Sequence, residues 1–256
     1  MVMQRNIYIK NAQEIAIMRE AGWINALALA AVRDLIRPGV TTSDLDNAAA
    51  EVIRKQGAKP AFLGVPGAYP YPATTTVSVN DELVHGIPGK RRLQEGDIVS
   101  VDCGTIFEGF VGDSAFSMGV GEISVQAQNL IDVTEKSLYI GIEILRAGNR
   151  VGDVVEAIQK FVEGQGFHLT REYTGHGVGR EMWEGPQVPN YGIAGRGALL
   201  RSGMTIALEP MVLVGSSRTR VLPDRWTVAS ADGSLTAHFE HSIAITDNGP
   251  LILTAL

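Results

Sequence analysis

One segment of the chain occurs twice, and this internal repeat constrains the fold more than any other feature of the sequence. The residues RPGVTTSD at 37–44 align with RAGNRVGD at 146–153 at a constant offset of 109 positions. Two copies are too few for a solenoid, in which several repeats stack on one another. The repeat therefore predicts a single domain over residues 1–256, made of two similar halves at about 1–120 and 121–256.

Each copy of the repeat lies in the same predicted order of elements: a long helix, a glycine-containing break, a shorter helix and then β structure. Apolar residues at helical spacing predict helices over 11–36, 43–56, 124–146 and 152–163. Apolar and β-branched runs predict strands at 75–80, 97–104, 107–113, 204–214, 225–230, 235–246 and 250–254. Helices followed by strands in each half favour the α+β class over βαβ alternation.

Charge and cysteine content limit the partners and the compartment. The net charge is −6 and no basic patch is interleaved with aromatic residues, so neither nucleic acid nor an anionic membrane is a predicted partner. No apolar run approaches the roughly 20 residues that span a bilayer, and the N-terminus lacks a signal pattern. Cys103 is the only cysteine, which excludes an intrachain disulfide and suits a reducing compartment. We therefore predict a soluble, cytoplasmic protein.

Five acidic or imidazole side chains occupy positions where a purely structural role is hard to justify. Asp102, Asp113, Glu209 and Glu240 lie in or beside apolar strand-like runs, and His176 lies between two glycines. Carboxylates are seldom buried unless they are paired or bound to a metal. Any one of these residues alone is more often a turn or salt-bridge residue. The five together favour a metal centre.

The chemistry of this set indicates which ions it would hold. Four carboxylates and one imidazole, with no thiolate, suit Mn²⁺, Fe²⁺, Co²⁺ or Zn²⁺. Four carboxylates carry more charge than one divalent ion neutralises, and carboxylates bridge readily. We therefore predict two divalent ions with a bridging water, an arrangement that supplies hydroxide for hydrolysis near neutral pH. The first half contributes two ligands and the second half three, so the site is predicted at the seam between the halves.

At these residues the chain resembles the type I methionine aminopeptidases, which belong to the pita-bread metallopeptidases. The resemblance extends over nearly the whole chain and rests on the motifs VHGIPG, IVSVDCG, FVGDS, REYTGHGVGR, GMTIALEPM, RWTV and FEHSIAITDNG. It implies a pita-bread fold, in which two pseudo-symmetric halves share a central curved antiparallel sheet covered by helices. It also implies removal of the initiator methionine from nascent proteins, by attack of a metal-bridged hydroxide.

The resemblance further implies roles for individual residues. The five residues named above would be the metal ligands, with Asp113 and Glu240 bridging the two ions and Glu209 also acting as general base. His85, in VHGIPG, would contact the substrate near its N-terminus and help to stabilise the reaction centre. Without the resemblance, a histidine between valine and glycine is more often an ordinary turn residue.

The predicted pocket contains the departures from the family pattern. The resemblance places Trp226 and Tyr71 beside the methionine side chain, and Met182 stands where the family commonly has an aromatic residue. Trp183 stands where the family usually has a histidine. An indole N–H can donate one hydrogen bond, but it can neither accept one nor carry a proton. His238 stands where the family usually has glutamine, two residues before a metal ligand, and we expect it to hydrogen-bond beside the ligands.

Two alternative functions are open at this stage. Another pita-bread exopeptidase, such as a proline-specific aminopeptidase, would use the same ligands. Those relatives normally carry an added N-terminal domain, whereas this chain begins almost directly at its first predicted helix. A non-catalytic metal- or peptide-binding module is favoured only by Trp183. The predicted partner is a peptide or nascent-chain N-terminus, with the ribosome as a further candidate, and the predicted state is a monomer.

Overall fold

The computed structural model describes residues 6–256 and contains all four predicted helices, each within three residues of its predicted bounds. They are α1 (Ala12–Arg33), α2 (Thr42–Lys55), α3 (Val125–Ile144) and α4 (Val151–Gly164). The repeat is visible in them, because α2 and α4 begin and end at positions 109 apart. The breaks before them contain Gly39 and Gly148, with φ of 90° and 95°. Glycine adopts this left-handed conformation without steric cost, which explains its place in both copies.

Fifteen strands are assigned within the described residues, and every pairing between them is antiparallel. One sheet joins β1 (Lys59–Pro60), β2 (Thr75–Val79), β4 (Ile98–Phe107) and β5 (Phe110–Gly119). A five-stranded sheet joins β7 (Thr174–Gly177), β8 (Glu184–Pro189), β9 (Thr205–Leu208), β14 (His241–Thr246) and β15 (Gly249–Ile252). A three-stranded sheet joins β6 (His168–Leu169), β10 (Met211–Leu213) and β13 (Thr236–His238). Another three-stranded sheet joins β3 (Glu82–Val84), β11 (Thr219–Val221) and β12 (Val228–Ser230).

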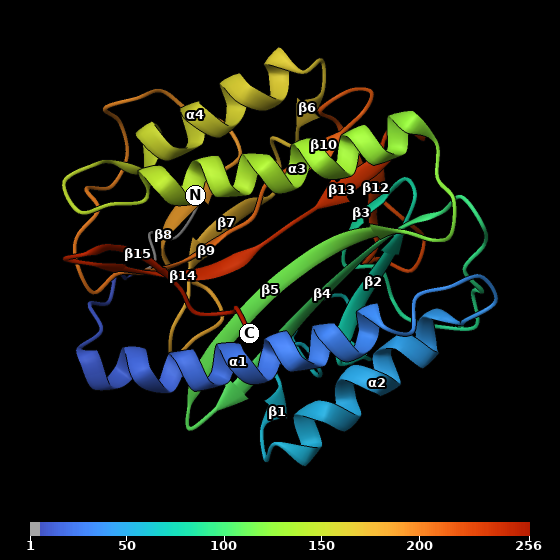
Figure 1. Ribbon diagram of the computed structural model, residues 1–256, viewed down its shortest axis with the longest axis horizontal. Coiled ribbons are helices and arrows are strands. Elements are labelled where there is room, and N and C mark those ends of the chain that lie inside the picture. The colour runs from blue at the N-terminus through green and yellow to red at the C-terminus, as the bar shows by residue number, and fades with distance from the viewer. Residues whose placement is uncertain (1–5) are drawn as a thin grey trace.

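The helix pairs lie on either side of the strands in the view of Figure 1, with α1 and α2 below and α3 and α4 above. α1 packs on β4 and β5, and α3 contacts β10 and β13. Buried valines on β4, such as Val99 and Val101, belong to the hydrophobic core that continues under both helix pairs. The predicted α+β class is therefore confirmed.

The two longest predicted strands are interrupted, and each interruption lies at a candidate ligand. The run 204–214 divides into β9 and β10 at Glu209 and Pro210, because proline has no N–H to continue the ladder. The run 235–246 divides into β13 and β14 at Phe239 and Glu240. Our prediction that these glutamates lie inside continuous strands was therefore wrong.

A seam between the halves forms where β5 meets residues 238–242. The backbone of Ala115 exchanges two hydrogen bonds with that of Glu240, with N···O distances of 3.3 and 3.0 Å. On either side, serine hydroxyls replace the ladder bonds: Ser117 Oγ accepts from His238 N, and Ser242 Oγ accepts from Asp113 N. The chain of the second half is thereby fixed beside β5, so that residues from both halves share one region.

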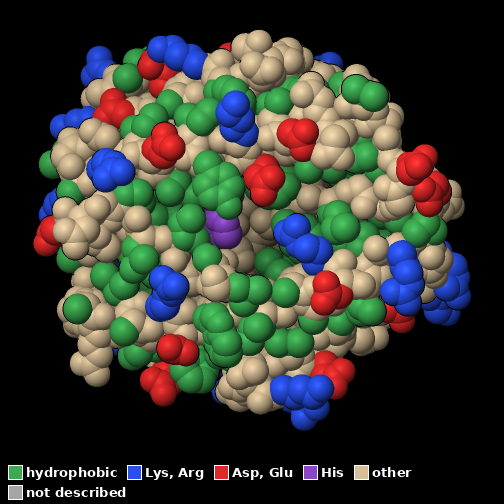
Figure 2. Space-filling model, in the orientation of Figure 1, with side chains coloured by type: hydrophobic (Ala, Val, Ile, Leu, Met, Phe, Trp, Pro, Cys, Tyr) green, Lys and Arg blue, Asp and Glu red, His purple; other side chains and the backbone are tan. Residues whose placement is uncertain are grey.

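The face drawn in Figure 2 is formed largely by α1 and α3, and it has a hollow between them that is also lined by the C-terminal residues. By length and composition alone, α1 could span a membrane, contrary to our expectation that no run is long enough. Half of its most apolar window is buried, which is typical of a core helix of a soluble protein.

Candidate metal centre and adjoining pocket

Strand register brings the first two predicted ligands together. Asp102 on β4 pairs with Ala115 on β5, and Asp113 lies two residues from Ala115 on the same strand. Residues two apart on a strand share a face, so the two carboxylates are diagonal neighbours on one side of the sheet. Both belong to the wall of a cavity of about 310 Å³.

Strand register also positions the candidate ligands of the second half. His176 on β7 pairs with Ala207 on β9, and Glu209 follows two residues later, just past the end of β9. Because His241 pairs with Leu208, continuing that register places Glu240 opposite Glu209. The backbone link of Glu240 to β5 then brings this group onto the face that carries the two aspartates.

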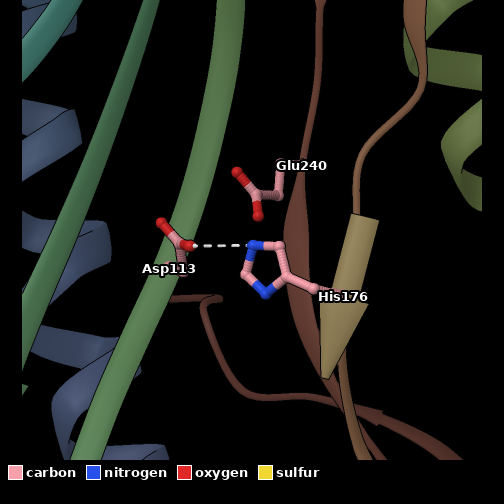
Figure 3. A group of neighbouring side chains, drawn as sticks. All are labelled: Asp113, His176 and Glu240. Atoms are coloured by element: carbon pink, nitrogen blue, oxygen red, sulfur yellow. Dashed lines mark ion pairs between the residues drawn. The ribbon is translucent and has the colours of Figure 1, made fainter. Parts of the chain in front are cut away.

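The side chains converge closely. His176 Nε2 lies 3.5 Å from Glu209 Oε1 and 3.9 Å from Asp113 Oδ2. Figure 3 shows the ring of His176 pointing between the carboxylates of Asp113 on β5 and Glu240, which lies between β13 and β14. Ligand atoms of Asp113, His176 and Glu240 all lie within 4.8 Å of one another, and so do those of Glu209, His238 and Glu240. Glu240 is thus common to two overlapping groups.

Negative charge is concentrated in this buried space. Burial raises the pKa of Asp113 to about 7. Burial, together with the charge of Asp113, raises the pKa of Asp102 well above its ordinary value. Burial and the neighbouring carboxylates likewise raise the pKa values of Glu209 and Glu240. Without a counter-charge, these groups cannot all be ionised at neutral pH without a large cost.

The polar atoms of the cluster fit divalent cations. Among residues 6–256, four deeply buried atoms of this cluster have no hydrogen-bond partner: Asp102 Oδ1, Asp113 Oδ1, Glu240 Oε1 and His238 Nε2. The ring of His176 is oriented for the same purpose, because its Nδ1 lies 2.9 Å from the carbonyl oxygen of Gly177, to which it can donate, leaving the Nε2 lone pair toward the carboxylates. Oxygen and imidazole donors of this kind suit Mn²⁺, Fe²⁺, Co²⁺ and Zn²⁺.

His85 lies in the wall of the same cavity, directly after β3. Its φ of 61° is uncommon for a residue with a side chain, and such conformations cluster at functional sites. Burial lowers its pKa to about 4, so the ring is neutral at pH 7. Its ring centroid lies 5.9 Å from that of Tyr173 and 6.5 Å from that of Trp226, both edge-on.

Apolar side chains line the cavity beside the carboxylates. Tyr71 and Trp226 pack edge to face with centroids 5.1 Å apart. Tyr71 Oη lies 2.9 Å from the Gly86 carbonyl oxygen, and Trp226 Nε1 donates to the Tyr69 carbonyl oxygen at 3.2 Å. These bonds fix the orientation of both rings in the cavity wall. The remaining apolar lining residues are Phe62, Val65, Val84, Met182 and Met211.

Met182 and Trp183 both border this cavity, and Trp183 is 39% exposed. The turn that carries them is held by an ion pair that sequence reasoning missed. Glu184 is buried, and it pairs with Lys10 and accepts a hydrogen bond from Arg180 N at 2.8 Å. No pattern in the sequence connects two residues 174 positions apart, so only the fold reveals the pair.

A buried cluster of carboxylates and imidazole, shared between two halves of an antiparallel fold, defines a metallohydrolase type of site. The chain belongs to metallopeptidase family M24, whose family model matches residues 16–247. A methionine aminopeptidase of Clostridium perfringens is 48% identical over 98% of this chain and 99% of its own length. The crystal structure of methionine aminopeptidase from Thermotoga maritima superposes with a TM-score of 0.95 at 48% identity, covering 98% of this chain and all of that one.

A prolidase from Pyrococcus furiosus has the same fold, with a TM-score of 0.79 at 21% identity over 97% of this chain and 65% of its own. The predicted pita-bread fold is therefore confirmed, and so is the resemblance to the methionine aminopeptidases. At this lower identity the prolidase indicates the fold alone.

Proposed function

We propose that this protein is a metal-dependent aminopeptidase that removes N-terminal methionine from peptides and nascent proteins. The observation that carries the proposal is the buried cluster of four carboxylates and a histidine, which lines one cavity of about 310 Å³ together with apolar side chains. Full-length similarity to methionine aminopeptidases supports the same activity. We further propose that residues 1–256 act as one catalytic domain with the two halves described above.

Substrate would bind with its first side chain among the apolar residues of the cavity. The edge-to-face pair of Tyr71 and Trp226 would form a rigid side of the binding site. The flexible thioethers of Met182 and Met211 would adapt to an apolar substrate side chain. His85 lines the same cavity, with its ring centroid 6.5 Å from that of Trp226, and its neutral ring would contact the first peptide group. The carboxylates of the cluster would attract the free N-terminal amine, which distinguishes an aminopeptidase from an endopeptidase.

The ligands would be Asp102, Asp113, His176, Glu209 and Glu240, holding two divalent ions of Mn, Fe, Co or Zn. Such ions would polarise the scissile carbonyl and lower the pKa of water at the site. Glu209 would accept a proton from the attacking water at a carboxylate oxygen and pass it to the leaving amine. Its position supports this role, because Glu209 Oε1 lies 3.5 Å from His176 Nε2 and the side chain lines the same cavity as the other ligands.

We also propose a cytoplasmic, monomeric protein that processes the N-termini of newly made chains, with the ribosome as a candidate partner. The single cysteine suits a reducing compartment, and the net charge of −6 offers no general affinity for nucleic acid.

A peptide panel tests the activity. The protein, loaded with Mn²⁺ or Co²⁺, is given peptides that begin Met-Ala, Met-Lys, Ala-Pro and Leu-Ala, and the released amino acid is identified by mass. We expect methionine release from Met-Ala and little or no cleavage of the others. The variant Asp113→Asn is the control, because it removes a ligand with little change of shape and should abolish release.

Two outcomes would overturn the proposal. Cleavage confined to the Ala-Pro peptide would assign a proline-specific exopeptidase. Two tightly bound ions with no hydrolysis of any peptide would assign a binding module.

A further inference from the structure

His238 is a buried imidazole directed at the carboxylate cluster, and the ligand set proposed above makes no use of it. It is 1% exposed, and its Nε2 has no hydrogen-bond partner among residues 6–256. That nitrogen lies 3.5 Å from Glu209 Oε2. Burying a ring nitrogen without a hydrogen-bond partner costs free energy. A bound group that interacts with this nitrogen would remove that cost.

Glu209 lies between two imidazoles in a nearly symmetrical arrangement. Its Oε1 is 3.5 Å from His176 Nε2, and its Oε2 is 3.5 Å from His238 Nε2. His176 belongs to one of the two convergent groups, with Asp113 and Glu240. His238 belongs to the other, with Glu209 and Glu240. Each group therefore contains one imidazole, and the two groups share a carboxylate.

The spacing distinguishes a shared cation from a direct hydrogen bond. Hydrogen bonds between an imidazole N–H and a carboxylate have N···O distances of about 2.7–2.9 Å. Ligand atoms that each lie about 2.1 Å from one ion are roughly 3.0–3.5 Å apart at the usual angles between ligands. The 3.5 Å separation is long for the hydrogen bond and suits two ligands of one ion.

The backbone holds His238 in this position independently of the cluster. Its N–H donates to Ser117 Oγ at 2.8 Å, and its carbonyl oxygen accepts from the same hydroxyl at 2.9 Å. Ser117 lies on β5, four residues after Asp113. The strand that carries Asp113 therefore also fixes the position of the His238 backbone. His238 and Glu240 are two residues apart, and their ligand atoms lie within 4.8 Å of one another.

We propose that His238 is a sixth protein ligand of the metal centre, which binds one divalent cation together with Glu209 and Glu240. The inference rests on the proposed function, since it takes the cluster to be a metal centre. It adds a second imidazole to the proposed ligand set. A neutral nitrogen donor adds affinity without adding to the negative charge of the four carboxylates.

Proton NMR of the Co²⁺-loaded protein tests the ligand directly, because ring protons of a coordinated imidazole are strongly shifted by the paramagnetic ion. Protein made with ring-deuterated histidine identifies these signals by their loss. We expect two shifted histidine rings in the unsubstituted protein and one in His238→Gln. His85→Gln is the matched control: it removes a ring in the same cavity that belongs to neither convergent group, so two rings should remain.

Metal titration gives a second measurement. Glutamine is close in length and neutral, so His238→Gln should fold, and we expect its affinity for one of the two ions to fall by at least about 10-fold. His241→Gln should leave both affinities unchanged, because His241 Nδ1 is bonded to Thr254 Oγ1 at 2.8 Å, away from the cluster.

The results separate this inference from the proposed function. Two bound ions with a single shifted ring would overturn the assignment of His238 and leave the aminopeptidase proposal standing. Failure of the protein to bind any divalent ion would overturn both.

Discussion

At the scale of single residues, the position that most affects the expected chemistry is Trp183. It borders the cavity that also contains His85 and the carboxylates, just before β8. Resemblance to the family predicts a histidine here. Indole retains the ability to donate a hydrogen bond, but it cannot accept a proton or carry a charge. The other elements of the site are present, so this substitution would tune the rate and leave the reaction intact.

We expect Trp183→His to raise kcat/KM for a peptide beginning Met-Ala. Removal of a single group that stabilises the transition state typically costs about 10²–10³ in rate. Because the indole N–H still supplies a donor, the expected gain is smaller, about 10-fold. Steady-state kinetics of the metal-loaded protein measure it.

The control for this substitution is Trp183→Phe, which removes the indole N–H without adding an imidazole. Its kcat/KM should not exceed that of the unsubstituted protein. An unchanged or lower kcat/KM in Trp183→His would contradict the expectation that tryptophan at this position lowers the rate.

At the scale of elements, the site depends on how closely α1 approaches β5, the strand that carries Asp113. A Cβ at Gly112 would lie 2.6 Å from the backbone nitrogen of Gly22 on α1. A Cβ at Gly22 would lie 2.3 Å from the carbonyl oxygen of Leu253. The absence of side chains at both glycines thus lets helix, strand and C-terminal segment pack backbone to backbone.

We expect Gly112→Ala to lower the free energy of unfolding by about 1–3 kcal/mol, since backbone atoms cannot move aside as a flexible side chain could. Displacement of β5 should also weaken metal binding through Asp113. Gly164→Ala provides the contrast. That glycine ends α4, and a Cβ added there would meet nothing within 4 Å, so alanine should stabilise by roughly 0.5–1 kcal/mol. Denaturant titration measures the free energy of unfolding of both variants. Equal changes in Gly112→Ala and Gly164→Ala would contradict the proposed close packing at Gly112.

At the scale of the whole molecule, the buried carboxylates couple metal binding to stability. Asp113 has a pKa of about 7 in the folded protein, well above the value of 3.8 expected in an unfolded chain. Between these pH values, the folded state binds more protons than the unfolded state, so stability falls as pH rises. The buried histidines act in the opposite direction, because their pKa values are lowered, and their effect is nearly complete by about pH 7.5, one unit above the pKa of an unfolded histidine.

We therefore expect the metal-free protein to lose stability from about pH 7 to 8, where the four carboxylates with raised pKa values outweigh the small remaining effect of the histidines. Divalent ions should remove this loss, because they replace the protons, and should stabilise by about 2.7 kcal/mol at 100 times their dissociation constant. Thermal melts with chelator and with Mn²⁺ measure both effects. Asp113→Asn should flatten the pH dependence in chelator, and a Tm that rises with pH in the metal-free protein would contradict the expectation.

The sequence by itself determined the four helices, the α+β class and the identity of the carboxylates. These depend on local periodicity, on a repeat of fixed offset and on acidic residues within apolar runs. Only the tertiary structure decided that the run 235–246 breaks at Glu240, because the backbone of Glu240 pairs with Ala115 in the other half. It also decided that Lys10 pairs with Glu184 and that His238 faces Glu209. Contacts between distant segments depend on strand register and packing, which no local pattern encodes.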